Sequence, residues 1–125
     1  MNLKLLPEKF GILKLTRPQD FPTWLGQAKV FFVAQTEDEY SIMCPQDAIP
    51  AGIDYSADYR CFRADGDLDF DEVGVVARLS QPLADAGLSL FLVSTHDRDY
   101  VFVAEADLAQ AQAIYRNNGV NIRDS

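Results

Sequence analysis

Polar groups that can bind a ligand concentrate in one short link of this chain, between Ser94 and Tyr100. The link STHDRDY carries a hydroxyl at Thr95, the single histidine at His96 and a carboxylate at Asp99. A carboxylate in such a link can hold a ligand's amino or guanidinium group through charge-assisted hydrogen bonds. The same side chains are also compatible with a solvated turn, whose surface ion pairs contribute little to stability.

A second group of candidate residues lies at the start of a predicted helix, in the stretch DFDEVGVV. Asp69 and Glu72 have the spacing of a capping box, so we expect the helix to begin here. Backbone N–H groups at a helix start suit a ligand carboxylate, and Gly74 lets a ligand approach the backbone closely. Both features also have a structural explanation, because acidic residues favour the helix dipole and a glycine permits close helix–strand packing.

No residue pattern in the chain indicates catalysis. The sequence lacks the G-x-S-x-G, phosphate-loop, C-x-x-C and H-E-x-x-H motifs. His96 has no second histidine or nearby cysteine with which to share a metal. Cys44 and Cys61 have no evident base beside them, so we expect both to be small core hydrophobes. We therefore predict no catalytic residue, no metal ligand and no cofactor.

The charge of the chain limits its partners. The 125 residues carry a net charge of -8, whereas nucleic acids and anionic membranes are bound by clustered Lys and Arg. No apolar stretch is long enough to span a bilayer, and the N-terminal MNLKLLP is too short and too polar for a secretory signal. Two isolated cysteines fit a reducing compartment. We expect a cytoplasmic protein that binds neither nucleic acid nor membrane.

Hydrophobic periodicity predicts the elements that must position these groups. In the second half the order is strand, helix, strand, strand, helix, strand, which is the ferredoxin-like arrangement. The predicted strands there are residues 59–64, 88–93, 100–103 and 120–123, and the predicted helices are residues 69–86 and 105–118. We expect Gly87 and Gly119 to end these helices, because glycine adopts the left-handed conformation of a helix C-cap.

The first half is predicted to follow the same order with shortened helices. Its predicted strands are residues 10–16, 30–35 and 40–44, its helical turns are residues 22–25 and 46–49, and its linker is residues 50–58. The chain therefore divides into an N-terminal module, residues 1–58, and a C-terminal module, residues 59–125.

The two halves also share a short motif, which indicates a duplicated module. VAQTEDEYSIM, residues 33–43, is a weaker copy of the link described above. With a one-residue gap in the alignment, Thr36 matches Thr95 and Asp38 matches Asp97. The same alignment pairs Glu39 with Asp99 and Tyr40 with Tyr100.

The order of these motifs resembles the ACT domain, a small ligand-binding regulatory module. The stretches that carry the resemblance are TEDEYSI at 36–42, DEVGVVA at 71–77, PLA at 82–84, Ser94-Thr95 and DYV at 99–101. More narrowly, the chain is similar to a tandem-ACT family of small bacterial proteins and mammalian cytosolic arginine sensors. The resemblance implies an α+β fold of two packed ferredoxin-like modules, βαββαβ, with antiparallel sheets and helices on one face.

The resemblance also implies a function. Amino acids bind such proteins where modules meet, and the matching positions in this sequence are Asp71, Glu72, Gly74, Val75, Val76, Thr95, His96 and Asp99. The expected protein is a non-catalytic regulatory homodimer with an amino acid as its ligand. His96 and Arg98 stand where the arginine sensors carry aromatic residues, and we expect Arg98 to offset the charge of Asp99. The alternative is a protein-interaction or oligomerisation module with a degenerate, ligand-free pocket.

Overall fold

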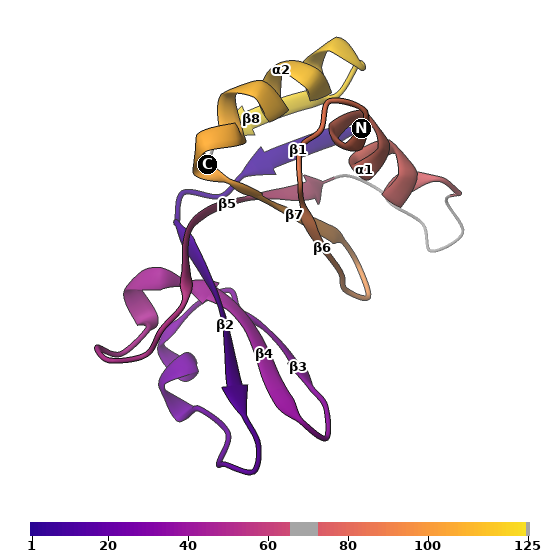
Figure 1. Cartoon of the computed structure of the whole chain (residues 1–125). Helices are drawn as coiled ribbons and strands as arrows, with labels where there is room; N and C mark the ends of the chain where they lie inside the picture. The colour runs from indigo at the N-terminus through magenta and orange to yellow at the C-terminus, as the bar shows by residue number, and fades with distance from the viewer. Residues whose placement is uncertain (66–72, 125) are drawn as a thin grey trace. The chain divides into compact units, whose positions relative to one another are not determined.

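The computed structural model of the chain describes residues 1–65 and 73–124 (Figure 1). Its residues form two compact units. We call Met1–Pro7 together with Arg60–Ser125 the terminal unit, and Glu8–Tyr59 the inserted unit. The sequence-based division after residue 58 assigns Met1–Pro7 to the first module, whereas the compact units group this segment with the second half of the chain.

In the terminal unit the strands and helices follow the predicted order, and one further strand precedes them in the sequence. The elements are β1 (Asn2–Leu5), β5 (Ser56–Asp65, which enters this unit at Arg60), α1 (Val75–Asp85), β6 (Phe91–Ser94), β7 (Asp99–Ala104), α2 (Leu108–Asn117) and β8 (Asn121–Asp124). The strands pair in the order β6-β7-β5-β1-β8. The order from β5 to β8 confirms the α+β, ferredoxin-like prediction.

The strand β1 was not predicted from the sequence. It pairs antiparallel with β5, where Leu3 lies opposite Ala64, and parallel with β8, where Leu3 lies opposite Ile122. A four-residue strand gives too short a pattern to recognise, and its place depends on partners at the other end of the chain. The sheet of this unit is therefore not purely antiparallel.

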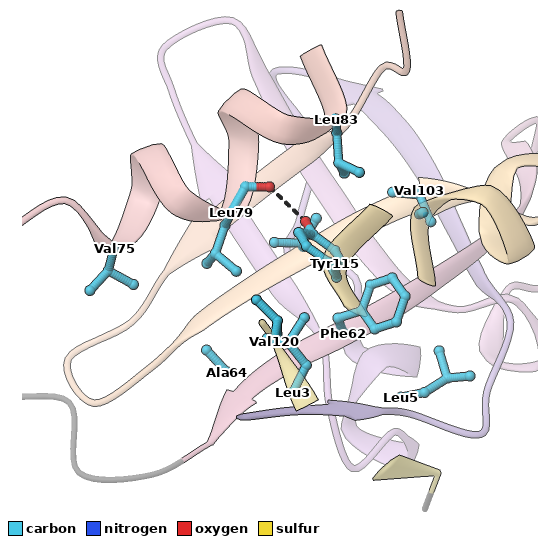
Figure 2. Close-up of a cluster of buried hydrophobic side chains, with 12 residues drawn as sticks. Leu3, Leu5, Phe62, Ala64, Val75, Leu79, Leu83, Val103, Tyr115 and Val120 are labelled. Atoms are coloured by element: carbon cyan, nitrogen blue, oxygen red, sulfur yellow. Dashed lines mark hydrogen bonds between the residues drawn. The ribbon is translucent and has the colours of Figure 1, made fainter. Parts of the chain in front are cut away.

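One face of this sheet packs against both helices (Figure 2). The strands contribute Leu3, Leu5, Phe62, Ala64, Val101 and Val103, and the helices contribute Val75, Leu79, Leu83, Ala111 and Tyr115. The Tyr115 hydroxyl donates a hydrogen bond of 2.6 Å to the Leu79 carbonyl and so ties α2 to α1. The Tyr115 ring meets Phe62 edge to face, with centroids 5.6 Å apart.

Both helices of the terminal unit end as the sequence predicts. Gly87 has φ of 78° and Gly119 has φ of 80°. The Gly87 N–H donates to the Ala84 carbonyl, and the next N–H donates to Leu83. This pair of bonds is the Schellman motif, and the bonds that end α2 at Gly119 have the same pattern.

The starts of the helices differ more from the predictions. The predicted capping box of Asp69 and Glu72 lies outside the described residues, and α1 is assigned from Val75. The predicted helix at 105–118 begins with a 3₁₀ turn at Glu105–Asp107, and the α-helical part is Leu108–Asn117.

The inserted unit is built around a separate core. Its strands are β2 (Phe10–Thr16), β3 (Phe32–Gln35), β4 (Glu39–Pro45) and the first residues of β5, paired in the order β3-β4-β2-β5. The buried residues that form this core cluster are Leu13, Leu25, Tyr40, Ile42 and Cys44. The predicted helical turns are short 3₁₀ helices at Thr23–Gln27 and Gln46–Ala48. The predicted linker is wrong at its end, because β5 already begins at Ser56, where it pairs with Ile12.

Candidate functional site

The polar link of the sequence forms the turn between β6 and β7. The Thr95 N–H donates to the Arg98 carbonyl at 2.7 Å, and the Arg98 N–H donates to the Thr95 hydroxyl at 3.1 Å. The Thr95 hydroxyl donates in turn to the Arg98 carbonyl at 3.0 Å. Thr95 therefore closes the turn, and its hydroxyl is already engaged by the backbone.

His96 and Asp97 at the tip of this turn face solvent. His96 Nδ1 lies 2.7 Å from Asp97 Oδ1, and both side chains are 81% exposed. The Ser94 hydroxyl donates a hydrogen bond of 2.5 Å to Asp99 Oδ1. Asp99 is thus held at the end of β7 by a neutral hydroxyl group.

The turn between β3 and β4 repeats this geometry in the inserted unit. The Thr36 N–H donates to the Glu39 carbonyl at 2.9 Å, and the Glu39 N–H donates to the Thr36 hydroxyl at 3.1 Å. Gln35 pairs with Tyr40 as Ser94 pairs with Asp99. The predicted match of Thr36 with Thr95 and of Asp38 with Asp97 is therefore confirmed.

The one-residue gap in that alignment is wrong. Because the two turns have the same length, Glu39 corresponds to Arg98 and Tyr40 corresponds to Asp99. This register keeps the buried positions in step, since Ile42 then corresponds to the buried Val101. A shift of one residue would reverse the two faces of the strand.

The second candidate group lies at the start of α1. Gly74 has φ of 85°, and its carbonyl accepts the first helical hydrogen bond, of 3.0 Å, from the Arg78 N–H. The Val75 side chain is 7% exposed and belongs to the core, so only its backbone can meet a ligand. Val76 is 48% exposed. Asp71 and Glu72 lie outside the described residues.

The described start of α1 and the β6–β7 turn lie toward one side of the terminal unit in Figure 2. Val75 marks the start of α1 in Figure 2, and the β6–β7 turn extends toward the same side. Arg98 in this turn has its Nε 3.8 Å from Asp65 Oδ1, at the end of β5. The turn therefore contacts the strand whose end leads toward α1.

Asp65 is the centre of a cluster of charges that the sequence did not reveal. Arg63 donates to both of its carboxylate oxygens, at 2.6 and 3.1 Å, and Arg123 donates at 2.5 Å. The Asp65 side chain is only 12% exposed. Hydrogen bonds from Arg63 and then Arg123 lower the pKa of Asp65 from 3.8 to about 2, although burial opposes this shift. The same hydrogen bond from Arg63 to Asp65 raises the pKa of Arg63.

Only part of this cluster has a signal in the sequence. Arg63 and Asp65 are two residues apart on a strand, so alternation places them on one face. Arg98 and Arg123 come from other elements, and only the fold brings them to Asp65. The expectation that Arg98 offsets the charge of Asp99 is wrong, because the described contact of its guanidinium is with Asp65.

The cysteines occupy core positions, as predicted. Cys44 and Cys61 are both buried, and neither forms a disulfide. Burial raises the pKa of the Cys44 thiol to about 11, so the reactive thiolate is disfavoured. Within residues 1–65 and 73–124, no three His, Cys, Asp or Glu side chains gather as metal ligands do. In the same part of the chain, no helix has the length and apolarity needed to cross a membrane.

Comparisons with known families give two matches along the chain. Residues 54–116 match the family described as the ACT domain. Residues 8–52, within the inserted unit, match a family described as an N-terminal domain. No curated protein matches the chain.

Solved structures provide further relatives. The Agobacterium tumefaciens protein Atu0741 is 31% identical, with a TM-score of 0.92, and the match covers 99% of this chain and 92% of that one. A chain in the crystal structure of the aspartokinase alpha and beta subunits is 16% identical in sequence, with a TM-score of 0.68. The match covers 94% of this chain and 96% of that one. The regulatory subunit of aspartate kinase from Thermus thermophilus is 14% identical, with a TM-score of 0.63, and the match covers 92% and 95%. The last two similarities concern the fold alone.

Proposed function

We propose that this chain, which belongs to the ACT-domain family, is a non-catalytic regulatory module that binds an amino acid at an interface between ACT modules. The observation that carries the proposal is the family match over residues 54–116, which includes both candidate groups. The proposed ligand-binding residues are Asp71, Glu72, Gly74, Val75, Val76, Thr95, His96 and Asp99.

The geometry of the β6–β7 turn supports a ligand with an amino group. Asp99 accepts a hydrogen bond from Ser94, which carries no charge, and Arg98 is directed to Asp65 instead. The Asp99 carboxylate lies at the half-buried start of β7, where it can hold an ammonium group. Backbone N–H groups at the start of α1 suit the carboxylate of the same ligand.

The proposal extends to the whole chain. The shared turns closed by Thr36 and Thr95 support a tandem of ACT-like modules, an N-terminal one in residues 1–58 and a C-terminal one in residues 59–125. In this tandem the first module contributes β1 to the sheet of the second. By analogy with the arginine sensors, we propose a cytoplasmic homodimer, in which four modules come together.

Binding can be tested by thermal shift with each of the twenty amino acids. A ligand at 100 times its Kd should add about 2.7 kcal/mol to the free energy of unfolding. We expect at least one amino acid to stabilise the protein, and Asp99→Ala to abolish this response without unfolding the chain. The matched control is Asp97→Ala, because Asp97 is 81% exposed in the same turn. If no amino acid stabilises the protein, or if both variants respond like the wild type, the proposed site is wrong.

The second candidate function is an oligomerisation module whose pocket is degenerate. It is favoured by β8, which in the described part of the terminal unit pairs with β1 alone. Such an edge strand can pair with a second chain. Light scattering after size exclusion separates the two proposals: a dimer that forms equally well with and without every amino acid supports this second function.

A further inference from the structure

The face of the terminal sheet opposite the helices carries a row of positive side chains. Leu3, Ala64 and Ile122 pack toward the helix-covered core. Because side chains alternate along a strand, the sequence neighbours of these three residues point to the other face of the sheet. The register places Lys4 opposite both Arg63 on β5 and Arg123 on β8. We call Lys4, Arg63 and Arg123 the basic row.

Like charges directly opposite each other on neighbouring strands destabilise a sheet unless other groups balance them. In the described contacts, both arginines of the basic row pair with the carboxylate of Asp65. A third arginine, Arg98, approaches the same carboxylate at 3.8 Å. Among the described residues, the Asp65 carboxylate thus meets the guanidinium groups of three arginines, and Lys4 lies opposite two of them. This concentration of basic side chains among the described residues contrasts with the net charge of -8 of the whole chain.

A pocket of about 260 Å³ lies beside the row. It lies at the paired ends of β1, β5 and β8 and shares Arg123 with the row; its lining residues are Asn2, Leu3, Asp65, Asn121, Ile122 and Arg123. The Asn121 amide donates to the Asn2 side-chain oxygen at 3.1 Å. The pocket therefore offers amide donors next to guanidinium donors.

We propose that the basic row and this pocket bind a small dianion that carries carboxylate or phosphate groups. Arg98 and Arg123 are 43% and 61% exposed, so their donors can reach a ligand. A guanidinium group binds carboxylate or phosphate oxygens in a two-pronged geometry, and a lysine adds a point charge. A ligand with two negative charges would neutralise what Asp65 leaves unbalanced. The inference does not rest on the amino-acid site, which uses other residues.

The test is isothermal titration of the full chain with succinate and, separately, with inorganic phosphate, at constant ionic strength. We expect binding by at least one of them, with a Kd that Lys4→Gln and Arg123→Gln each raise by about tenfold, equivalent to about 1.4 kcal/mol. The matched control is Arg116→Gln, since Arg116 is an exposed arginine in the last turn of α2. This control should leave the Kd unchanged within about a factor of two.

The pattern of results separates the ligand classes and can overturn the proposal. Binding of succinate alone assigns a dicarboxylate, and binding of phosphate alone assigns a phosphate group. No heat from either at about 10 mM, which would saturate a millimolar site, overturns the inference. An equal loss in Arg116→Gln would mean nonspecific charge attraction and would also overturn it. Asp99→Ala should retain dianion binding, so failure of the amino-acid site is distinguishable.

Discussion

Asp65 combines one interaction with a neighbour on its own strand and two with residues distant in the sequence. Its carboxylate accepts hydrogen bonds from Arg63 on the same strand and from Arg123 on β8, and it lies near Arg98 of the β6–β7 turn. Because the side chain is only 12% exposed, these contacts are weakly screened by water. One residue therefore connects the end of β5 to two other elements of the terminal unit.

The charge of Asp65 should make stability depend on pH. At neutral pH we expect Asp65→Asn to lower the free energy of unfolding by about 2 kcal/mol, because the folded state holds the ionised carboxylate. The folded pKa is lowered from 3.8 to about 2, so this stabilisation is complete above pH 3.8 and is lost as the pH falls through about 2. Urea unfolding of both proteins across this range measures the difference.

Asp97→Asn provides the control for this experiment. Asp97 is 81% exposed, so its loss should change stability by no more than about 0.5 kcal/mol. A difference between wild type and Asp65→Asn that stays constant from neutral pH to below pH 2 would show that the ionised cluster does not stabilise the fold.

At the scale of single elements, the helix ends and the two turns follow from short local patterns. Gly87 and Gly119 end their helices in the left-handed conformation that the sequence predicts. Thr36 and Thr95 close turns of equal length with the same hydrogen bonds. Each of these features depends on a few consecutive residues, so the surrounding fold does not need to be known.

The conformation at Gly119 gives a direct test of this point. Gly119→Ala should destabilise the protein by about 1–2 kcal/mol, because an L-residue with a side chain is strained at positive φ. Space is not the cause, since an added Cβ would meet nothing within 4 Å. Gly26→Ala is the matched control: its Cβ would also meet nothing within 4 Å, and its φ is not in the left-handed range. Equal unfolding midpoints for the two variants would refute the C-cap assignment.

At the scale of the whole molecule, the terminal unit is assembled from both ends of the chain. Met1–Pro7 joins Arg60–Ser125, and β1 lies between β5 and β8. The Leu6 N–H donates to the Cys61 carbonyl at 2.9 Å, so the two segments run side by side where the inserted unit departs and returns. The strand β1 is therefore an internal part of a unit from which it is separated in sequence.

This arrangement predicts how fragments behave. A fragment of residues 60–125 lacks the strand between β5 and β8 and should lose most of the ~5–15 kcal/mol typical of a folded domain. Joining residues 1–7 to residue 60 through a linker of about four residues, the length of a hairpin loop, should restore a cooperative fold. Circular dichroism with urea unfolding compares the two proteins. Equal stability of both would mean that β1 is dispensable.

The candidate site was predictable in part. Thr95, His96 and Asp99 belong to one turn, as their adjacency in the sequence implies. Val75 was predicted as a site residue, but its side chain is buried in the core, because periodicity alone does not show which helix residues face the sheet. The partner of Arg98 could not be predicted, since Asp65 is close to it only through strand pairing.

Local patterns of residues were enough to predict the order of most strands and helices, the glycine helix ends and the threonine-closed turns. These features follow from backbone conformation and hydrophobic alternation over a few residues. The folded chain was needed to show that β1 completes the terminal sheet, that Lys4 lies between Arg63 and Arg123, and that both arginines meet Asp65. Those features depend on pairing between segments far apart in the chain, for which a single sequence contains no local signal.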